Sequence, residues 1–382
     1  MYKVATLNKI SPVGLAELGE EYEISESLER AEAIIVRSFK MNDMEFEDEL
    51  LAIGRAGSGT NNIPVDRCAE EGIVVFNAPG ANANSVAELV IGAMFEAARN
   101  IPEGTAWANT LDGDVAKAVE KGKGQFAGHE ISGKKMGVIG LGHVGLLVAN
   151  KAAALGMDVT AYVRTPREVP GLSPDVTMVY DMDKVLAESD YLSIHIPGGG
   201  DNKGLISAEK IAKMKDGVVF LNFARADIVD DEAMLMAVED RKVARYITDF
   251  PNDKLVGRYH VVVIPHLGAS TEESEERCAA MAASEVREYL EKGNIANSVN
   301  FPAVSLGDIP AGMSRLCLLG QAGAPLKEQA HEAAAAAGVT IAEETEAEGK
   351  GKAVYLADIS KPVDEQALLE ALPDGMILAR VL

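Results

Sequence analysis

The chain has 382 residues, a length that predicts two or three domains, and its formal net charge is −23 with a pI near 4.7. A surface of this charge excludes nucleic acid and anionic membrane as partners. An anionic small molecule can bind only where arginine or lysine is locally concentrated. The three cysteines are widely spaced, no apolar run would span a bilayer, and the first residues lack the core of a signal peptide. We therefore expect a cytoplasmic protein with reduced thiols.

Residues 1–94 alternate short apolar segments with helical stretches. The segments "KVATLN", "AEAIIVRS", "LLAIGRAG" and "GIVVFNA" predict buried strands, and "SVAELVIGAMFEAARN" predicts a helix with Ser85 as its N-cap. Strands that alternate with helices are typical of a parallel sheet covered by helices.

A second series of the same kind starts at "KKMGVIG". The segments "MDVTAYV", "YLSIHI", "GVVFLNFA", "YITDF" and "HVVVIPH" predict strands, and helices lie between them at "VGLLVANKAAALG" and "DDEAMLMAVEDRK". A longer helix follows at "STEESEERCAAMAASEVREYLEKG". The chain therefore predicts an α/β fold with two doubly wound parallel-sheet, Rossmann-like domains.

The tail from residue 313 has a different pattern. "RLCLLG", "GVTIAEE", "KAVYLAD" and "MILARVL" predict strands, and "LKEQAHEAAAAAG" and "VDEQALLEALP" predict helices. The order βαββαβ at this size predicts a ferredoxin-like domain, joined through the linker "NSVNFPAVSLGDIPAG". Its exposed strand edges favour assembly into a homodimer or homotetramer.

A glycine-rich turn follows the first strand of the second series. In "GVIGLGHVG", the residues Gly140, Gly142 and Gly145 form G-x-G-x-x-G between a strand and a helix, and His143 and Val144 lie within the turn. Such a turn lets the backbone approach a pyrophosphate at the helix N-terminus, so it predicts a dinucleotide site. The alternative is a glycine-rich turn that binds nothing.

The next strand ends at a position that matters for the choice of cofactor. A dinucleotide site commonly has a carboxylate there for a ribose hydroxyl, whereas this chain has Val163 followed by Arg164 and Thr165. Valine cannot accept those hydrogen bonds, and an arginine at this turn can accommodate a 2′-phosphate. We expect NAD as the cofactor, with NADP as the alternative.

Five further polar residues lie at or just after predicted strands. Arg225 can grip a carboxylate, and His266 can exchange the proton that accompanies hydride transfer. Asp249 and Asp253 could contact the nicotinamide or orient His266, and His195 could line the cofactor crevice. The alternatives are a surface arginine, a structural histidine and solvated turn aspartates. The histidines have no metal-ligand spacing, so we expect no metal.

Several stretches, taken in order, resemble the D-isomer-specific 2-hydroxyacid dehydrogenases, and the tail resembles the ACT regulatory domain. The stretches lie between residues 34 and 302 and are "VRSFK", "GRAGSGTNNIP", "VFNAPGANANSVAELVIG", "GVIGLGHVG", "NFARADIVDDEAM", "IPHLGASTEESEERCA" and "NSVNFP". The resemblance implies a discontinuous substrate-binding domain, residues 1–94 and 287–311, and a dinucleotide-binding domain, residues 95–286. An ACT-like domain, residues 313–382, follows them.

The resemblance also implies roles for individual residues. Arg225 would clamp the carboxylate and carbonyl oxygen of the substrate, His266 would be the general acid/base, and Asp249 would lie near the nicotinamide carboxamide. The family's glutamate that polarises the histidine is absent, and Asp253 is the nearest acid. Four residues match substrate-binding positions: Arg37, Ser58, Gly59 and Asn82.

The implied reaction is NAD(P)-dependent oxidation of an anionic small molecule, D-3-phosphoglycerate, to 3-phosphohydroxypyruvate, the first step of L-serine biosynthesis. Two alternatives stay open. One is a dehydrogenase or reductase for another D-2-hydroxyacid, and the other is a dinucleotide-sensing protein without turnover. In the tail, Gly320 and Ala322 replace the His-x-Asn turn common in serine-binding ACT domains, so we expect no serine binding through those side chains.

Overall fold

The computed structural model describes residues 1–373 and 375–382, and these form two compact units. Unit 1 comprises Met1–Asn82 and Glu272–Leu382, and unit 2 comprises Ala83–Thr271. The expected boundaries at residues 94 and 286 fall inside helices α3 (Ala83–Arg99) and α10 (Glu272–Lys292), whereas the units divide where each helix begins. The reason is packing, since α3 lies against α6 of unit 2 and α10 lies against the strands of unit 1.

Unit 1 contains a parallel sheet of five strands in the order β2-β1-β3-β4-β5. Four of them lie where apolar segments predict strands. The edge strand β2 was not predicted, because only its first residue, Tyr22, is buried. The strands are β1 (Tyr2–Leu7), β2 (Tyr22–Ser25), β3 (Ala33–Val36), β4 (Ala52–Arg55) and β5 (Val74–Asn77).

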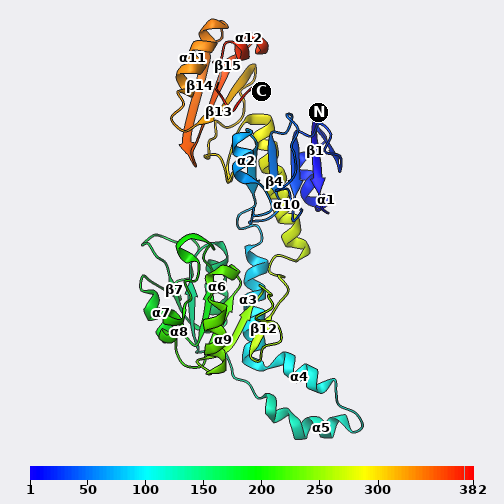
Figure 1. The fold of residues 1–382 in the computed structure, drawn as a ribbon, viewed down its shortest axis with the longest axis vertical. Helices are drawn as coiled ribbons and strands as arrows, with labels where there is room; N and C mark the ends of the chain where they lie inside the picture. Colours follow the sequence, from blue (N-terminus) through cyan, green and yellow to red (C-terminus); the bar gives the residue numbers. More distant parts are fainter. Residues whose placement is uncertain (374) are drawn as a thin grey trace. The chain divides into compact units, whose positions relative to one another are not determined.

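Helices cover both faces of this sheet. The short helix α1 (Pro12–Leu15) and the long helix α10 pack together on one face, and α2 (Val65–Glu70) lies on the other (Figure 1). The contact between α1 and α10 requires Gly14, because a Cβ there would lie 2.4 Å from the Cβ of Ala279. Small residues thus bring α10 close enough to complete the core of unit 1.

Unit 2 contains a second parallel sheet, of seven strands in the order β12-β11-β10-β9-β6-β7-β8. The order reverses between β9 and β6, and in such sheets the crevice at the carboxyl ends of the strands binds the ligand. The strands are β6 (Lys135–Ile139), β7 (Asp158–Tyr162), β8 (Val176–Val179), β9 (Tyr191–Ile194), β10 (Val218–Asn222), β11 (Val243–Thr248) and β12 (Val261–Val263).

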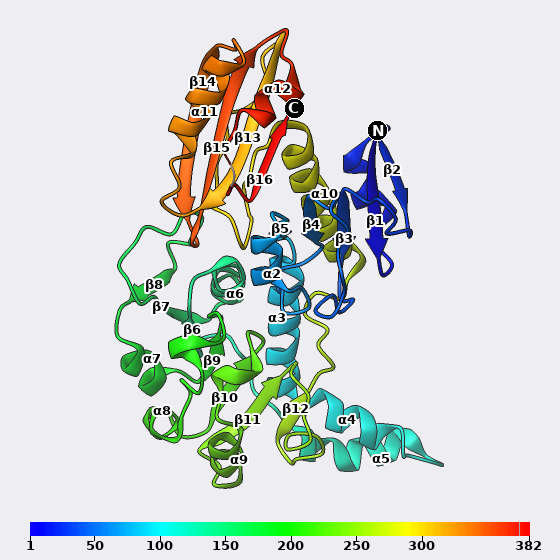
Figure 2. The same cartoon turned by 45° about the horizontal axis from the view of Figure 1, so that its top comes forward.

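Helices sandwich the sheet of unit 2 (Figure 2). α3 and α6 (His143–Ala154) cover one face, and α7 (Met182–Glu188), α8 (Ala208–Lys213) and α9 (Asp231–Glu239) cover the other. The predicted Rossmann-type architecture is therefore confirmed for the two parallel sheets. Within the described residues, no helix combines the length and apolar character that a membrane span requires.

A helical hairpin extends outward from unit 2, as Figures 1 and 2 both show. It consists of α4 (Ile101–Ala108), α5 (Val115–Gly122) and the 3₁₀ turn η2 (Lys123–Phe126), and none of these three elements contains a buried residue. Its main internal contact joins the rings of Trp107 and Phe126, whose centroids are 5.2 Å apart. The hairpin therefore has no core of its own.

The tail forms the predicted βαββαβ order, with a four-stranded antiparallel sheet in the order β14-β15-β13-β16. This topology is ferredoxin-like. Helices α11 and α12 pack on one face of the sheet, and the other face joins the core of unit 1. The elements are β13 (Met313–Gln321), α11 (Leu326–Ala336), β14 (Ile341–Gly349), β15 (Lys352–Ser360), α12 (Glu365–Glu370) and β16 (Leu378–Val381).

Two arginines, the buried Arg315 and the half-buried Arg380, connect the tail to the end of α10. Arg315 pairs with Asp358 at 2.7 Å, and its Nη1 donates to the carbonyl oxygens of Lys292 at 2.9 Å and Gly307 at 2.8 Å. Arg380 donates to the carbonyl of Leu290 at 3.3 Å and stacks over the ring of Tyr289 at 4.2 Å. Helix α10 leaves the carbonyls of Leu290 and Lys292 in its last turn without intrahelical partners, so the two arginines act as its C-terminal cap.

Candidate active site

The glycine turn joins β6 to α6 under tight steric limits. Gly140 has φ +97°, and a Cβ there would lie 2.5 Å from the carbonyl oxygen of His195. A Cβ at Gly145 would lie 1.9 Å from the carbonyl oxygen of Gly140, so helix and strand meet too closely for any side chain. The sequence needs glycine at both positions to form this turn.

The N-terminus of α6 faces open space. Gly142 is the N-cap residue, and a Cβ on it would meet no atom within 4 Å. His143 is exposed at the first helical position, and Val144 is half-buried against the core. Unpaired amides and the helix dipole at such an end favour an anion, so this cradle fits a pyrophosphate.

A cavity of about 520 Å³ adjoins the glycine turn at the carboxyl ends of β6, β7 and β9. This is the place where the strand order reverses. Its shape and position suit the adenosine half of a dinucleotide. The lining residues are Gly140, Leu141, Gly142, Tyr162, Val163, Arg164, Thr165, Arg167, Met182, His195, Ile196, Pro197, Asp201, Asn202 and Leu205.

Two arginines and one valine decide the chemistry of this cavity. Val163 is 5% exposed and packs into the core, so it offers no acceptor to a ribose. Arg164 is exposed, and Nη2 of Arg167 donates to the carbonyl oxygen of Leu141 in the glycine turn at 2.9 Å. Arg167 was not predicted from the sequence, although its place three residues after Arg164 in "VRTPR" was a usable signal.

His195 forms part of the cavity wall and is neutral at pH 7. Its Nε2 lies 2.8 Å from Oγ of Ser193, and its backbone amide donates to the carbonyl of Ile139 at 2.7 Å. Burial lowers the pKa of His195 to about 3. It therefore shapes the crevice without adding charge.

Arg225 lies in an ordered turn after β10. The side chain of Asn222 bridges this turn, since its Oδ1 accepts from the amide of Ala224 at 3.1 Å and its Nδ2 donates to the carbonyl of Arg225 at 2.9 Å. The Arg225 side chain is exposed, and its Nη1 donates to the carbonyl of Ala224 at 2.7 Å. The remaining donors of the guanidinium are available to a carboxylate.

His266 occupies a left-handed backbone conformation with φ +48°. Its amide donates to the carbonyl oxygen of Asp249 at 3.1 Å and to that of Ile264 at 2.9 Å. The edge of its ring packs against Phe250, with centroids 5.2 Å apart and planes at 78°. Left-handed residues other than glycine carry strain and concentrate at functional sites.

Asp249 is buried behind His266. It is 3% exposed, the backbone of Gly268 bonds its carboxylate, and Oδ1 has no hydrogen-bond partner among the residues that the structure describes. Burial raises the pKa of Asp249, and the charges of His266 and Arg225 oppose that rise. The structure thus brings together three residues that the sequence singled out.

Asp253 does not join this group. It is exposed in the turn after β11, and within residues 1–373 and 375–382 no hydrogen bond connects it to His266. Asn252 organises the turn instead, because its Oδ1 accepts from the amides of Lys254 at 3.0 Å and Leu255 at 3.2 Å. The role expected for Asp253 therefore stays a prediction without a supporting contact.

The substrate-binding residues expected in unit 1 form two separate groups. Oγ of Ser58 lies 3.2 Å from Oδ1 of Asn82, and in the described residues the amides of Ser58 and Gly59 have no acceptor, as a carboxylate-binding loop requires. Arg37 instead pairs with Glu275, Nη1 to Oε1 at 2.6 Å. The positive charge expected of Arg37 is thus already compensated, and sequence spacing gave no sign of this partner.

Comparison with known proteins is consistent with this geometry. Residues 91–268 match the family model described as "D-isomer specific 2-hydroxyacid dehydrogenase, NAD binding domain". A hydroxypyruvate reductase from Thermotoga maritima is 37% identical over 271 residues, which are 68% of this chain and 84% of that protein. A D-3-phosphoglycerate dehydrogenase from Methanocaldococcus jannaschii is 33% identical over 330 residues, which are 83% of this chain and 61% of that protein.

Among solved structures, the cofactor (NAD+) bound 3-phosphoglycerate dehydrogenase of Entamoeba histolytica is similar with a TM-score of 0.62 and 27% identity. The similarity covers 78% of this chain and 98% of that one. The chain spans between 56% and 64% of the length of the curated phosphoglycerate dehydrogenases from four organisms that it matches.

Proposed function

This chain belongs to the D-isomer-specific 2-hydroxyacid dehydrogenase family, and we propose that it oxidises D-3-phosphoglycerate to 3-phosphohydroxypyruvate with a nicotinamide cofactor. That reaction would be the first step of L-serine biosynthesis. The observation that carries the proposal is the grouping of Arg225, Asp249 and His266 at the carboxyl ends of strands in the sheet that also bears the glycine turn. The three buried free cysteines support a cytoplasmic setting.

The residues of the chain supply binding and proton transfer. Arg225 holds the substrate carboxylate through paired hydrogen bonds, and His266 takes the proton of the C2 hydroxyl as the hydride leaves C2. Asp249, when ionised, stabilises the imidazolium that forms. The glycine turn, the amides of α6 and the cavity beside them would hold the dinucleotide. When bound, its nicotinamide ring accepts the hydride.

A second candidate is reduction of hydroxypyruvate or another D-2-hydroxyacid pair without a phosphate. The observation that favours it is the ion pair between Arg37 and Glu275, because a phosphate would have to compete with that carboxylate. In unit 1 the free amides of Ser58 and Gly59 suit the carboxylate that both substrates share.

We propose that the protein uses NAD as its cofactor, with NADP as the alternative. Val163 removes the acceptor and the negative charge that select a bare 2′-hydroxyl, and Arg164 and Arg167 place positive charge in the same cavity wall. Asp201, which also lines the cavity, opposes a 2′-phosphate.

We propose that two copies of the chain associate through the α4–α5 hairpin, which has no buried residue and exposes Ile101 at 47% and Val115 at 45%. The tail, proposed to be ACT-like, is less suited to edge pairing. One of its two edge strands, β14, carries Glu343, Glu346 and Glu348, which would face like charges across a two-fold axis.

A steady-state assay tests the proposed function. Purified protein should oxidise D-3-phosphoglycerate with NAD or NADP, and His266→Ala should lower kcat by about a hundredfold or more while the protein stays folded. Hydroxypyruvate and other 2-ketoacids, assayed in the reverse direction, identify the second candidate. Dinucleotide binding without turnover of any of these acids would leave the sensing alternative. L-serine should not inhibit, because the tail lacks the usual side chains.

A further inference from the structure

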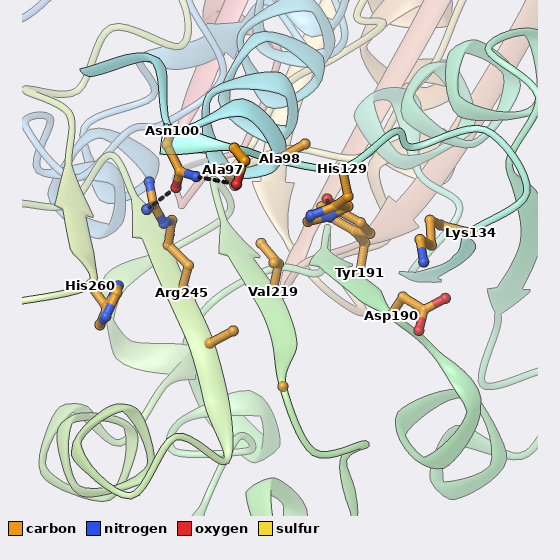
Figure 3. A pocket seen from close by; sticks show the side chains of 14 residues that line it. Ala97, Ala98, Asn100, His129, Lys134, Asp190, Tyr191, Val219, Arg245 and His260 are labelled. Carbon is orange, nitrogen blue, oxygen red and sulfur yellow. Dashed lines mark hydrogen bonds between the residues drawn. The ribbon is translucent and has the colours of Figure 1, made fainter. Parts of the chain in front are cut away.

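A second cavity, of about 390 Å³, lies at the amino-terminal edge of the sheet of unit 2. Its walls come from the end of α3, the residues that follow the hairpin, and the starts of β9, β10 and β11 (Figure 3). The glycine turn follows the carboxyl end of β6, so the two cavities lie at opposite edges of one sheet. The catalytic group described above therefore has no part in this cavity.

Arg245 is the central feature of the cavity. It is 6% exposed, and its Nη2 donates to Oδ1 of Asn100 at 3.0 Å and pairs with Oε1 of Glu103 at 2.9 Å. Its Nη1 is buried, and no atom of residues 1–373 or 375–382 accepts from it. A guanidinium stays charged at every accessible pH, and a buried donor without an acceptor is costly, so the site lacks one acceptor.

The other polar side chains in the cavity add donors. Lys134 and His260 line it, and burial lowers the pKa of His260, with Arg245 and Arg241 acting in the same direction. A neutral imidazole still presents one N–H. Asp190, the one acid among the described lining residues, is already paired with Nζ of Lys215 at 2.5 Å.

The acceptors at the end of α3 are occupied too. The carbonyl of Ala98 accepts from the amide of His129 at 2.9 Å, and the carbonyl of Asn100 accepts from the amide of Gly104 at 3.0 Å. The side chains of His129 and Tyr191 form a hydrogen bond with each other, with 2.7 Å between Nε2 and the hydroxyl oxygen. The cavity therefore presents unpaired donors in a chain whose net charge is −23.

We propose that this cavity binds a small anion bearing phosphate or carboxylate groups, with Arg245 as the main contact and Lys134 and His260 beside it. The site also borders both ends of the hairpin, since Asn100 precedes α4 and Ala127 follows η2, and Nδ2 of Asn100 reaches the carbonyl of Ala127 at 3.5 Å. An anion held here braces the base of the hairpin without touching the catalytic residues.

Hydrogen–deuterium exchange on the full chain, with inorganic phosphate or citrate against chloride at equal ionic strength, locates the binding. Phosphate or citrate should protect peptides covering residues 97–100, 127–134 and 243–246. Protection that chloride reproduces, or that spares these peptides, overturns the proposal. Because phosphate can also bind the active site, only these peptides count.

Variants and a crystal structure complete the test. Lys134→Ala should weaken the protection-derived affinity for phosphate about tenfold, the effect of losing one charge-assisted hydrogen bond. Lys121→Ala, an exposed lysine of the hairpin, should leave that affinity unchanged. Selenate soaked into crystals should give an anomalous peak beside Arg245. A carboxylate of a second copy at that place, or water alone, refutes the free-anion site.

Discussion

His266 and Asp249 are locked together by the backbone, because the amide of His266 donates to the carbonyl oxygen of Asp249 at 3.1 Å. The bond joins the backbone of His266 to a residue whose carboxylate is 3% exposed and whose Oδ1 has no partner among the described residues. Burial raises the pKa of Asp249, and the charge of His266 opposes this rise by favouring the ionised carboxylate. The family's glutamate, which polarises the histidine, is absent here. If Asp249 polarises His266, Asp253 is not needed for that role.

A pair of conservative substitutions separates the two aspartates. Asp249→Asn should move the midpoint of the pH–kcat/KM profile for oxidation to lower pH by about 0.5–1 unit, because the variant lacks the negative charge that favours the imidazolium. Asp253→Asn, at an exposed position without a bond to His266, should leave the profile unchanged. A shift in the Asp253 variant alone would return the role to the turn.

The cofactor cavity predicts a weak preference between NAD and NADP. Arg164→Ala should lower kcat/KM for NADP, and the loss should correspond to about 1.5–3 kcal/mol of transition-state stabilisation, the scale of a hydrogen bond to a charged group. The same substitution should change kcat/KM for NAD little. Arg167→Ala serves as the comparison, because its guanidinium also supports the glycine turn through Leu141, and its loss should affect both cofactors. A wild-type enzyme that prefers NAD a thousandfold would show that the loss of the carboxylate at Val163 is merely tolerated.

Local pattern was enough to predict most of the fold. The buried strands appear as apolar runs, and the glycine turn appears because steric limits act between residues only five positions apart. The edge strands β2 and β8 were missed; each has four residues and buries only its first, Tyr22 in β2 and Val176 in β8. Ser85 was expected to cap α3, yet the helix begins at Ala83, and the hydroxyl of Ser85 lies 3.0 Å from Oγ1 of Thr271.

The sequence could predict those parts of the site that depend on single residues at the ends of strands. Arg225, Asp249 and His266 end or follow apolar strands, and parallel strands bring their carboxyl ends to one edge. Contacts between residues far apart in the sequence were invisible. The pairing of Arg37 with Glu275 and the unpaired Nη1 of Arg245 depend on packing that no spacing rule encodes.

The exposed hairpin predicts an oligomer that charge can disrupt. Ile101→Glu combined with Val115→Glu should convert a dimer into a monomer, because a buried unpaired charge at an interface costs several kcal/mol. Analytical ultracentrifugation measures the change. Val13→Glu, on α1 of unit 1 and 64% exposed, adds one negative charge at an exposed apolar position away from the hairpin and should leave the dimer intact. A wild-type chain that is monomeric at micromolar concentration contradicts the proposed association.

The buried carboxyl of Glu285 on α10 makes the stability of unit 1 fall as the pH rises. Its side chain is buried, Oε1 accepts from Nδ2 of Asn297 at 2.5 Å, and Oε2 has no partner in the part of the chain that is described. Burial raises the pKa of Glu285 to about 7, and the bond from Asn297 opposes the rise. At pH values between the unfolded and the native pKa, the native state therefore keeps a proton that the unfolded chain has lost. This contribution to stability is complete below the unfolded pKa and disappears as the pH rises through 7.

Glu285→Gln should remove this loss, because the amide is neutral and its oxygen can still accept from Asn297. At pH 8 the variant should exceed the wild type in free energy of unfolding by about 1–3 kcal/mol, and near pH 4 the two should agree. Circular dichroism in urea is the suitable measurement, since the single tryptophan, Trp107, lies in unit 2.

Glu288→Gln, one turn along α10, is a control whose effect on the free energy of unfolding at pH 8 should have the opposite sign. Hydrogen bonds from Lys292 and Asn294 outweigh burial and lower the pKa of Glu288, so losing its charge should destabilise the chain at pH 8. If Glu285→Gln is equally destabilising at both pH values, the carboxyl of Glu285 does not bind protons differently in the native and unfolded states, and the pH dependence of unit 1 has another origin.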